Sequence, residues 1–303
     1  MIKKAGIIGL GALGGMYGEF LAKAMGRENV YILGDKERLC RYRKDGVFVN
    51  GSKIDFNYDI KDEKVDLLIV AKKFHHLKNA LENVKSFISE STIIISLLNG
   101  VSSEEVIRNT LECGKVLYCV AYGMDAQKYG NNIKFKNYGT LAIGEECNDK
   151  PSDTLMELKS FFDSIGLVYE IPDSMLNKLW SKFMLNVGIN QVCAAYGLNY
   201  GDVQTEGEYR NKMIAAMEEV LAIGEKMGVP LHYDDITCWL NVIDKLYAES
   251  RPSMAQDILN KNKTEVEIFA DTVIDLGKEY GIAVPINEEL GAIIHEKENS
   301  YEL

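Results

Sequence analysis

The chain has 303 residues and a mass of 34.0 kDa, and its 34 Lys and Arg against 45 Asp and Glu give a formal net charge of −11. This acidic balance argues against a nucleic-acid-binding protein, which needs a strong basic field. No uncharged apolar run reaches the about 18 residues of a membrane-spanning helix, so no membrane association is expected. At roughly 100–200 residues per domain, the length suggests two domains.

The cysteines and histidines point to an intracellular protein without a bound metal. The six cysteines include no C-x-x-C pair, and the N-terminus fits a first strand better than an export signal. We therefore expect a cytoplasmic protein with reduced thiols. The four histidines include the adjacent pair His75 and His76, which have no companion ligand cluster, so no metal site is expected.

Short apolar runs alternate with helical stretches through the first half of the chain. Strands are expected at residues 4–10, 30–33, 48–50, 53–58, 65–71, 92–98 and 116–121. Asn50-Gly51 predicts a hairpin turn between two of them, residues 131–144 suggest a closing antiparallel hairpin, and 151–165 suggest a helix. The alternation predicts a mostly parallel sheet with helices on both faces.

Almost everything after Pro172 has the period of a helix. Helices are expected from about residue 176 onward and at 213–227, 234–248, 253–279 and 287–297. The predicted fold class is therefore α/β, with an N-terminal Rossmann-type doubly wound domain at residues 1–170 and an all-α C-terminal domain at residues 171–303.

A glycine-rich motif follows the first predicted strand. Gly9-Leu10-Gly11-Ala12-Leu13-Gly14 matches G-x-G-x-x-G, in which the glycines allow a tight turn, close approach of a pyrophosphate, and close packing of helix on strand. The phosphates then meet the free N–H groups of a helix N-terminus. The alternative is a purely structural turn, but the strand–turn–helix context favours dinucleotide binding.

The segment after the second strand bears on the choice between NAD and NADP. Asp35 stands where a carboxylate can accept hydrogen bonds from the ribose 2′-hydroxyl, and its charge disfavours a 2′-phosphate. Several cations lie close by and could attract that phosphate: Lys36, Arg38, Arg41 and Arg43. The alternative is an exposed, charged turn and helix without a ligand.

Three polar residues recur every four positions on an apolar helix in the second half. Lys182, Asn186 and Asn190 stack along one stripe, and most of their neighbours are apolar. Buried polar groups need partners, which a polar ligand in a cleft would supply. The alternative is a solvent-facing stripe of an ordinary amphipathic helix.

Other candidates lie at strand ends and on the long helix predicted for 253–279. Asn99 follows one strand and Lys72-Lys73 another, where open α/β sheets bind ligands; plain turns are the alternative. Ser253 with Gln256 fits a capping box. Glu265 would lie about 18 Å farther along the same helix at 1.5 Å per residue, so both would meet a ligand only if it lay across the helix.

Together these residues resemble the ketopantoate reductase family (2-dehydropantoate 2-reductase) over nearly the whole chain. The motifs that carry the resemblance are G-L-G-A-L-G at 9–14, A-K-K-F at 71–74, S-L-L-N-G-V at 96–101, W-x-K-x-x-x-N-x-x-x-N at 180–190, and S-M-x-x-D with T-E-V-E at 253–267. The resemblance implies NADPH-dependent reduction of 2-dehydropantoate to pantoate, a step toward pantothenate and coenzyme A.

The resemblance also implies roles for individual residues. Lys182 corresponds to the catalytic proton donor. Substrate-binding positions correspond to Asn99, Lys182, Asn186, Asn190 and Ser253. Cofactor-binding positions correspond to the glycine motif 9–14, Asp35, Lys73 or its neighbour Lys72, Asn99 and Glu265. The family usually has an arginine near Asp35, so the resemblance implies NADP(H) whereas Asp35 itself favours NAD(H).

The predicted partner is a small 2-oxoacid substrate, with no nucleic acid, membrane or metal, and the protein is expected to be a monomer or homodimer. Two alternatives stay open. One is a related 2-oxoacid or imine reductase with the same architecture. The other is a dinucleotide-binding sensor without turnover, a hypothesis that the presence of Lys182 disfavours.

Overall fold

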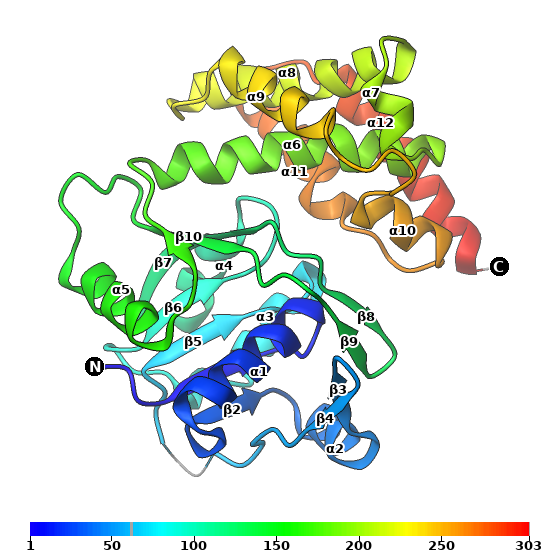
Figure 1. The fold of residues 1–303 in the computed structure, drawn as a ribbon. Coiled ribbons are helices and arrows are strands. Elements are labelled where there is room, and N and C mark those ends of the chain that lie inside the picture. The colour runs from blue at the N-terminus through cyan, green and yellow to red at the C-terminus, as the bar shows by residue number, and fades with distance from the viewer. Residues whose placement is uncertain (61–62, 303) are drawn as a thin grey trace. The chain divides into compact units, whose positions relative to one another are not determined.

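The structure is a computed structural model and describes residues 1–60 and 63–302. The chain divides into two compact units, Met1–Met175 and Leu176–Leu303. The first unit combines a sheet with helices and the second is helical (Figure 1).

The main sheet of the first unit has the strand order β11-β10-β7-β6-β5-β1-β2. The strands are β1 (Ala5–Ile8), β2 (Val30–Leu33), β5 (Leu67–Val70), β6 (Ile93–Ser96), β7 (Lys115–Tyr122), β10 (Thr140–Gly144) and β11 (Tyr169–Glu170). Strands β2, β1, β5, β6 and β7 are parallel, and β10 is antiparallel to β7. The predicted, mostly parallel sheet is therefore confirmed. From β1 the chain first adds β2 on one side and then returns to add β5 on the other side, so the strand order reverses between β1 and β5.

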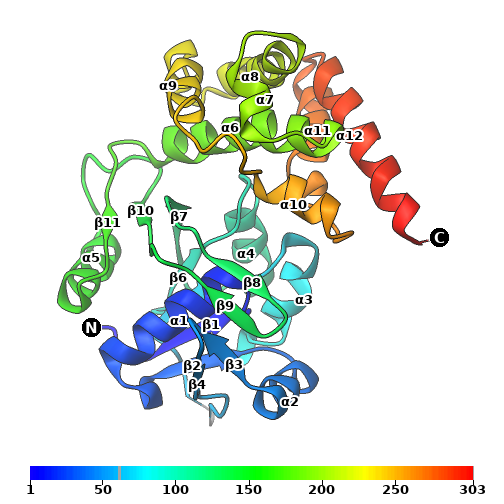
Figure 2. The ribbon, with the colours of Figure 1, turned by 45° about the vertical axis from the view of Figure 1, so that its right-hand side comes forward.

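Helices cover both faces of this sheet (Figure 2). One face packs against α1 (Ala12–Met25) and α5 (Asp153–Ile165), and the other against α3 (Leu77–Glu82) and α4 (Ser103–Leu111). Along β5 the side chains alternate between the two cores, with Leu67 and Ile69 in one and Leu68 and Val70 in the other. Apolar residues at every position of β5 are thus explained by burial on both faces.

A second sheet has the order β4-β3-β9-β8. Its strands are β3 (Val47–Val49), β4 (Ser52–Ile54), β8 (Gln127–Tyr129) and β9 (Asn132–Lys134). The hairpin turn predicted at Asn50-Gly51 is confirmed, with φ of 48° and 83° at its two central residues. The hairpin predicted over 131–144 is wrong in its bounds, because Gly130 (φ 58°) turns the chain earlier and β10 joins the main sheet instead.

The second unit consists of helices that follow the predicted order with two differences. The helices are α6 (Met175–Tyr196), α7 (Tyr200–Gln204), α8 (Glu208–Met227), α9 (Tyr233–Ile243), α10 (Ser253–Leu259), α11 (Ala270–Tyr280) and α12 (Pro285–Asn299). Helix α7, which begins at a capping box of Asn199 and Asp202, was not predicted. The single helix predicted for 253–279 is wrong, because Lys261 adopts a left-handed conformation (φ 52°) in a polar turn after α10.

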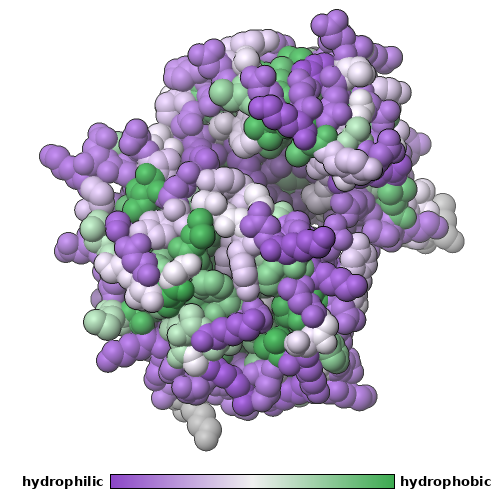
Figure 3. Space-filling view, viewed as in Figure 1, coloured by the Kyte–Doolittle hydropathy of each residue, from purple (hydrophilic) through white to green (hydrophobic). Residues whose placement is uncertain are grey.

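Hydrophilic residues predominate on the face shown in Figure 3, and apolar residues there form small, separate groups. The described part of the chain contains no helix that is both long and apolar enough to cross a lipid bilayer.

The first turn of α1 lies directly against two strand ends because Gly14 has no side chain. A Cβ at Gly14 would lie 1.9 Å from the carbonyl oxygen of Gly9 and 3.0 Å from the Cβ of Ala71. Backbone cannot yield as a flexible side chain can, so only glycine fits without moving the helix. This contact fixes the N-terminus of α1 above the ends of β1 and β5.

We predict that Gly14→Ala lowers the free energy of unfolding by about 2 kcal/mol, the usual scale of an overpacked core. The matched control is Gly11→Ala, whose Cβ would meet only the Ala71 carbonyl oxygen at 3.7 Å. That variant should lose less than about 1 kcal/mol. Urea unfolding of both variants measures the difference, and equal losses would contradict the packing role of Gly14.

Candidate functional site

The glycine turn after β1 has the form that a phosphate group requires. Gly9 has a φ of 92°, and the backbone turns sharply there into α1. The space that a side chain at Gly11 would fill is open apart from the Ala71 carbonyl oxygen at 3.7 Å, so a ligand can approach the backbone. Gly11 is the N-cap of α1 and no side chain caps the helix, which leaves its first N–H groups available to an anion. These features fit the pyrophosphate of a dinucleotide.

A cavity of about 280 Å³ lies beside this turn. Its lining consists of Gly9, Leu10, Gly11, Arg38, Tyr42, Ala71, Lys72, Lys73, His75, His76 and Lys128. Lys72 is partly buried and Lys73 is exposed, and both contribute to the cavity. The lining contains several cationic side chains and no carboxylate, so the cavity favours an anion.

Sequence reasoning missed Lys128. It lies on β8, and its ammonium group donates a hydrogen bond to the carbonyl oxygen of Leu10 in the glycine turn. The two residues are 118 positions apart in the sequence, and no local pattern around Lys128 signals this contact. Arg38, which was considered only as one of several nearby charges, lines the same cavity.

Asp35 has a structural role at the start of α2 (Lys36–Asp45). It is the N-cap of this helix, and its Oδ1 accepts a hydrogen bond of 2.8 Å from the backbone N–H of Arg38. Asp35 lines a neighbouring cavity of about 530 Å³ rather than the one beside the glycine turn. One carboxylate oxygen is therefore used by the fold, and the proposed contact of Asp35 with a ribose hydroxyl stays a prediction.

Asn99 lies in the loop after β6, and a buried polar chain holds the start of that loop. The Ser103 hydroxyl donates to Ser96 Oγ at 2.8 Å and lies 3.0 Å from Glu104 Oε2, and Leu98 N–H donates to Ser96 Oγ at 3.3 Å. Burial raises the pKa of Glu104. The Ser103 hydroxyl thus links Ser96, at the end of β6, to the Glu104 carboxyl group in the first turn of α4.

The stripe predicted on α6 forms an ordered chain of amides. Asn190 is buried, and its Oδ1 accepts hydrogen bonds of 3.3 Å from Ser253 Oγ and from Met254 N–H at the start of α10. Its Nδ2 donates to Asn186 Oδ1 at 3.1 Å. Asn186 Nδ2 is buried and has no partner among the described residues. A ligand oxygen would supply the acceptor that this N–H group needs.

The capping box predicted for Ser253 and Gln256 is wrong. Ser253 is the first helical residue of α10 and not its N-cap, which is Pro252, and a proline side chain has no polar atom that could cap the helix. Ser253 bonds to Asn190 instead, and Gln256 Nε2 donates to the Arg251 carbonyl oxygen at 2.9 Å. Glu265 is partly buried in the turn between α10 and α11, and so it does not share a helix with Ser253.

Two family models match the chain. The model described as "Ketopantoate reductase PanE/ApbA" matches residues 5–147, and the model described as "Ketopantoate reductase PanE/ApbA C terminal" matches residues 174–298. The chain belongs to the ketopantoate reductase family. The predicted family is thus confirmed, and the chain is placed among oxidoreductases.

Similar proteins cover almost the whole length of this ketopantoate reductase family member. The 2-dehydropantoate 2-reductase of Aquifex aeolicus (strain VF5) is 26% identical over an alignment of 307 positions, which covers 98% of this chain and 98% of that one. The PanE/ApbA family ketopantoate reductase structure from Ralstonia eutropha JMP134 has a TM-score of 0.84 at 24% identity and covers 99% of this chain and 100% of that one. The complex of D-mandelate dehydrogenase with NADH has a TM-score of 0.86 at 22% identity and covers 98% and 99%. These structures confirm the predicted fold class.

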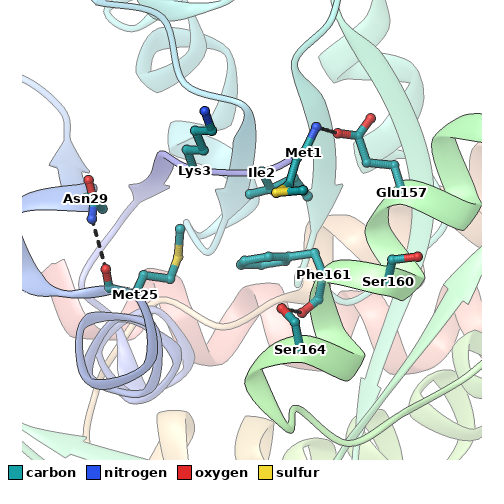
Figure 4. A pocket seen from close by; sticks show the side chains of 9 residues that line it. All are labelled: Met1, Ile2, Lys3, Met25, Asn29, Glu157, Ser160, Phe161 and Ser164. Carbon is teal, nitrogen blue, oxygen red and sulfur yellow. Dashed lines mark hydrogen bonds and ion pairs between the residues drawn. The ribbon is translucent and has the colours of Figure 1, made fainter.

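Another cavity, of about 760 Å³, lies at the opposite end of the first unit's sheet (Figure 4). Its walls come from the residues before β1, the C-terminal end of α1 and one side of α5. Its serines bond to carbonyl groups of their own helix, with Ser160 Oγ donating to Met156 and Ser164 Oγ to Phe161. Open α/β sheets bind ligands at the carboxyl ends of their strands, so this cavity is not the cofactor site.

Among the residues that the structure describes, no group of three or more His, Cys, Asp or Glu is arranged to hold a metal ion. The exposed rings of His75 and His76 lie 4.1 Å apart at their centroids. They line the cavity beside the glycine turn, which is a role that the sequence did not suggest.

We predict that the stability of this protein depends on pH through Glu104. The pKa of Glu104 is higher in the folded state than in the unfolded state, so folding favours the protonated carboxyl group. The native protein therefore loses stability as the pH rises from the pKa of the unfolded state through the pKa of the folded state. Glu104→Gln keeps the buried shape without the proton. As the pH rises above the ordinary carboxyl pKa, the variant should therefore gain stability relative to the native protein. Urea unfolding at each pH tests this, and a constant difference would show that Glu104 does not titrate.

Proposed function

We propose that this protein is a nicotinamide-dependent 2-dehydropantoate 2-reductase that reduces 2-dehydropantoate to pantoate in the cytoplasm, on the route to pantothenate and coenzyme A. Family membership and relatives named 2-dehydropantoate 2-reductase support the proposal. The observation that carries it is the amide chain on α6, which leaves the buried Asn186 Nδ2 as a donor without an acceptor among the residues that the structure describes.

Cofactor binding and proton transfer would be assigned to different units of the chain. The first unit would hold the dinucleotide at the glycine turn, with Lys73 or Lys72 and Asn99 at the ends of β5 and β6 as further contacts. In the second unit, Glu265 corresponds to a cofactor-binding position of the family. A bound, reduced nicotinamide supplies the hydride. The complex of D-mandelate dehydrogenase with NADH, which shares the fold, makes a nicotinamide dinucleotide the expected cofactor.

The second unit would carry the proton chemistry. Lys182 lies one helical turn before Asn186 on α6 and is partly buried. As the ketone is reduced, negative charge builds on its oxygen, and an ammonium group stabilises that charge and supplies the proton. Asn186 and Asn190 would orient the hydroxy acid, and Ser253, which bonds to Asn190, would hold this amide or contact the substrate itself.

The substrate is tested by a comparison of two ketoacids. Consumption of NADPH or NADH is followed after addition of either 2-dehydropantoate or phenylglyoxylate, the oxidised form of mandelate. We expect 2-dehydropantoate to give the higher kcat/KM. A preference for phenylglyoxylate would assign the protein to another 2-oxoacid, and binding of dinucleotide without any turnover would favour a sensor.

We predict that Lys182→Met lowers kcat by at least about 10²-fold, the usual contribution of a positioned acid. The substitution keeps much of the side-chain volume and removes the charge, so the melting temperature should change little. Lys226→Met, at an exposed lysine near the end of α8, is the matched control and should retain full activity. Near-native kcat in the Lys182 variant would remove this lysine from the mechanism.

We predict that Asp35→Asn shifts cofactor preference toward NADPH by about three- to tenfold in kcat/KM, because it removes a negative charge that repels a 2′-phosphate. Asparagine is a good N-cap, so α2 should stay intact. Asp35→Ala removes both charge and cap, and should show the same shift with a loss of about 1 kcal/mol in stability. An unchanged NADPH-to-NADH ratio in both variants would show that Asp35 does not face the ribose.

A further inference from the structure

The β8–β9 hairpin reaches the glycine turn because of a second close contact on α1. A Cβ at Gly15 would lie 2.0 Å from Cδ1 of Ile133 on β9, so the missing side chain lets the hairpin pack directly on the first part of α1. The hairpin is also tied to β3, which pairs with β9, and the backbone N–H of Asn50, directly after β3, donates to Ile133 O at 2.8 Å. The position of β8 relative to the glycine turn is therefore fixed by packing and by backbone hydrogen bonds.

This packing places Lys128 at the cavity beside the turn. Its ammonium group donates to Leu10 O and lies 5.5 Å from the centroid of the Tyr42 ring. A lysine has three N–H donors, and among the described residues the ammonium group of Lys128 has Leu10 O as its acceptor. Donors thus remain at the edge of the turn where the phosphates of a dinucleotide bind.

Arg38 faces the same cavity from α2. Burial lowers the pKa of Lys128, and the positive charge of Arg38 lowers it further, so the two cations lie within electrostatic reach of each other. Among the described residues, Asp35 has a carboxylate oxygen, Oδ2, at 3.9 Å from Nε of Arg38, while its Oδ1 caps α2; Asp35 does not line this cavity. Two cations from separate elements around one concave surface repel each other until an anion lies between them.

We propose that Lys128 and Arg38 form a phosphate-binding pair across the cavity beside the glycine turn, which makes the β8–β9 hairpin a third element of the dinucleotide site. The phosphate is either the pyrophosphate or the 2′-phosphate of NADP. Both are multiply charged oxyanions, for which lysine provides a point charge and arginine a fork of donors. This inference rests on the dinucleotide binding included in the proposed function, but not on the substrate.

The test is equilibrium binding of NAD⁺ and NADP⁺ to the full chain, measured by titration calorimetry without any ketoacid. Lys128→Gln and Arg38→Gln should each raise Kd about tenfold, equal to about 1.4 kcal/mol. An equal rise for both dinucleotides assigns the pair to the pyrophosphate, and a rise confined to NADP⁺ assigns it to the 2′-phosphate. Unchanged Kd for both dinucleotides would overturn the proposal.

Matched controls separate charge from structure. Lys134→Gln changes an exposed lysine of the same hairpin, and Lys44→Gln changes an exposed lysine of α2; neither should alter Kd. Lys128→Arg keeps the charge and should restore most of the affinity. If Lys128→Arg and Lys128→Gln lose affinity equally and both lower the melting temperature, Lys128 only holds the turn and the proposal fails.

The same titrations distinguish this proposal from the proposed function. Native protein that binds dinucleotide through the pair but does not reduce 2-dehydropantoate contradicts the function and leaves the pair intact. If the native protein reduces 2-dehydropantoate and the Lys128→Gln and Arg38→Gln variants bind both dinucleotides with native affinity, the phosphate-binding pair is contradicted and the proposed function stands.

Discussion

The contact of α1 with the ends of β1 and β5 at Gly14 is the constraint on which the dinucleotide half of the site depends. Because no side chain intervenes, the first turn of α1 sits against the backbone of Gly9, and its free N–H groups meet the open space above Gly11. One residue later, Gly15 lets Ile133 pack on the same helix, and the hairpin brings Lys128 to Leu10. The placement of α1 therefore determines where both the backbone N–H donors and the ammonium group of Lys128 lie. A shift of α1 would displace them together.

The helical unit uses a different principle, the direction of amide hydrogen bonds. A side-chain amide that accepts on its oxygen must donate on its nitrogen, so the bonds from Ser253 and Met254 to Asn190 Oδ1 fix which end of Asn190 faces Asn186. Asn186 Oδ1 then accepts from Asn190, and the Nδ2 group of Asn186 has no acceptor among the described residues. An unsatisfied buried donor costs about 1–3 kcal/mol. The fold thus tolerates a local loss of stability that a ligand oxygen can recover on binding.

Local patterns predicted the elements that depend on local physics, and failed where distant or competing interactions decide. The G-x-G-x-x-G motif and the four-residue spacing of Lys182, Asn186 and Asn190 predicted the glycine turn and the polar stripe. Helical periodicity continued across Asn260–Lys263, where a left-handed turn in fact ends α10, and Ser253 looked like a cap because its partner Asn190 is distant in sequence. The capping role of Asp35 could have been predicted, because an Asp directly before a helical stretch is a common N-cap. The contact of Lys128 with Leu10 could not, because tertiary packing alone brings these residues together.

The net charge of this protein and the charge around the cavity beside the glycine turn have opposite signs. The local charge decides whether a small anionic ligand is attracted to that cavity. A formal charge of −11 opposes any anion at long range, and it disfavours a nucleic-acid partner. Salt screens such forces beyond a Debye length of about 10 Å at 0.1 M, whereas cations a few ångströms from a phosphate in a cavity are screened much less. The cavity beside the glycine turn has Arg38, Lys72, Lys73 and Lys128 in its lining and no carboxylate, so its field is positive within an acidic protein. The overall negative charge then keeps larger polyanions away while the cavity remains available to a dinucleotide.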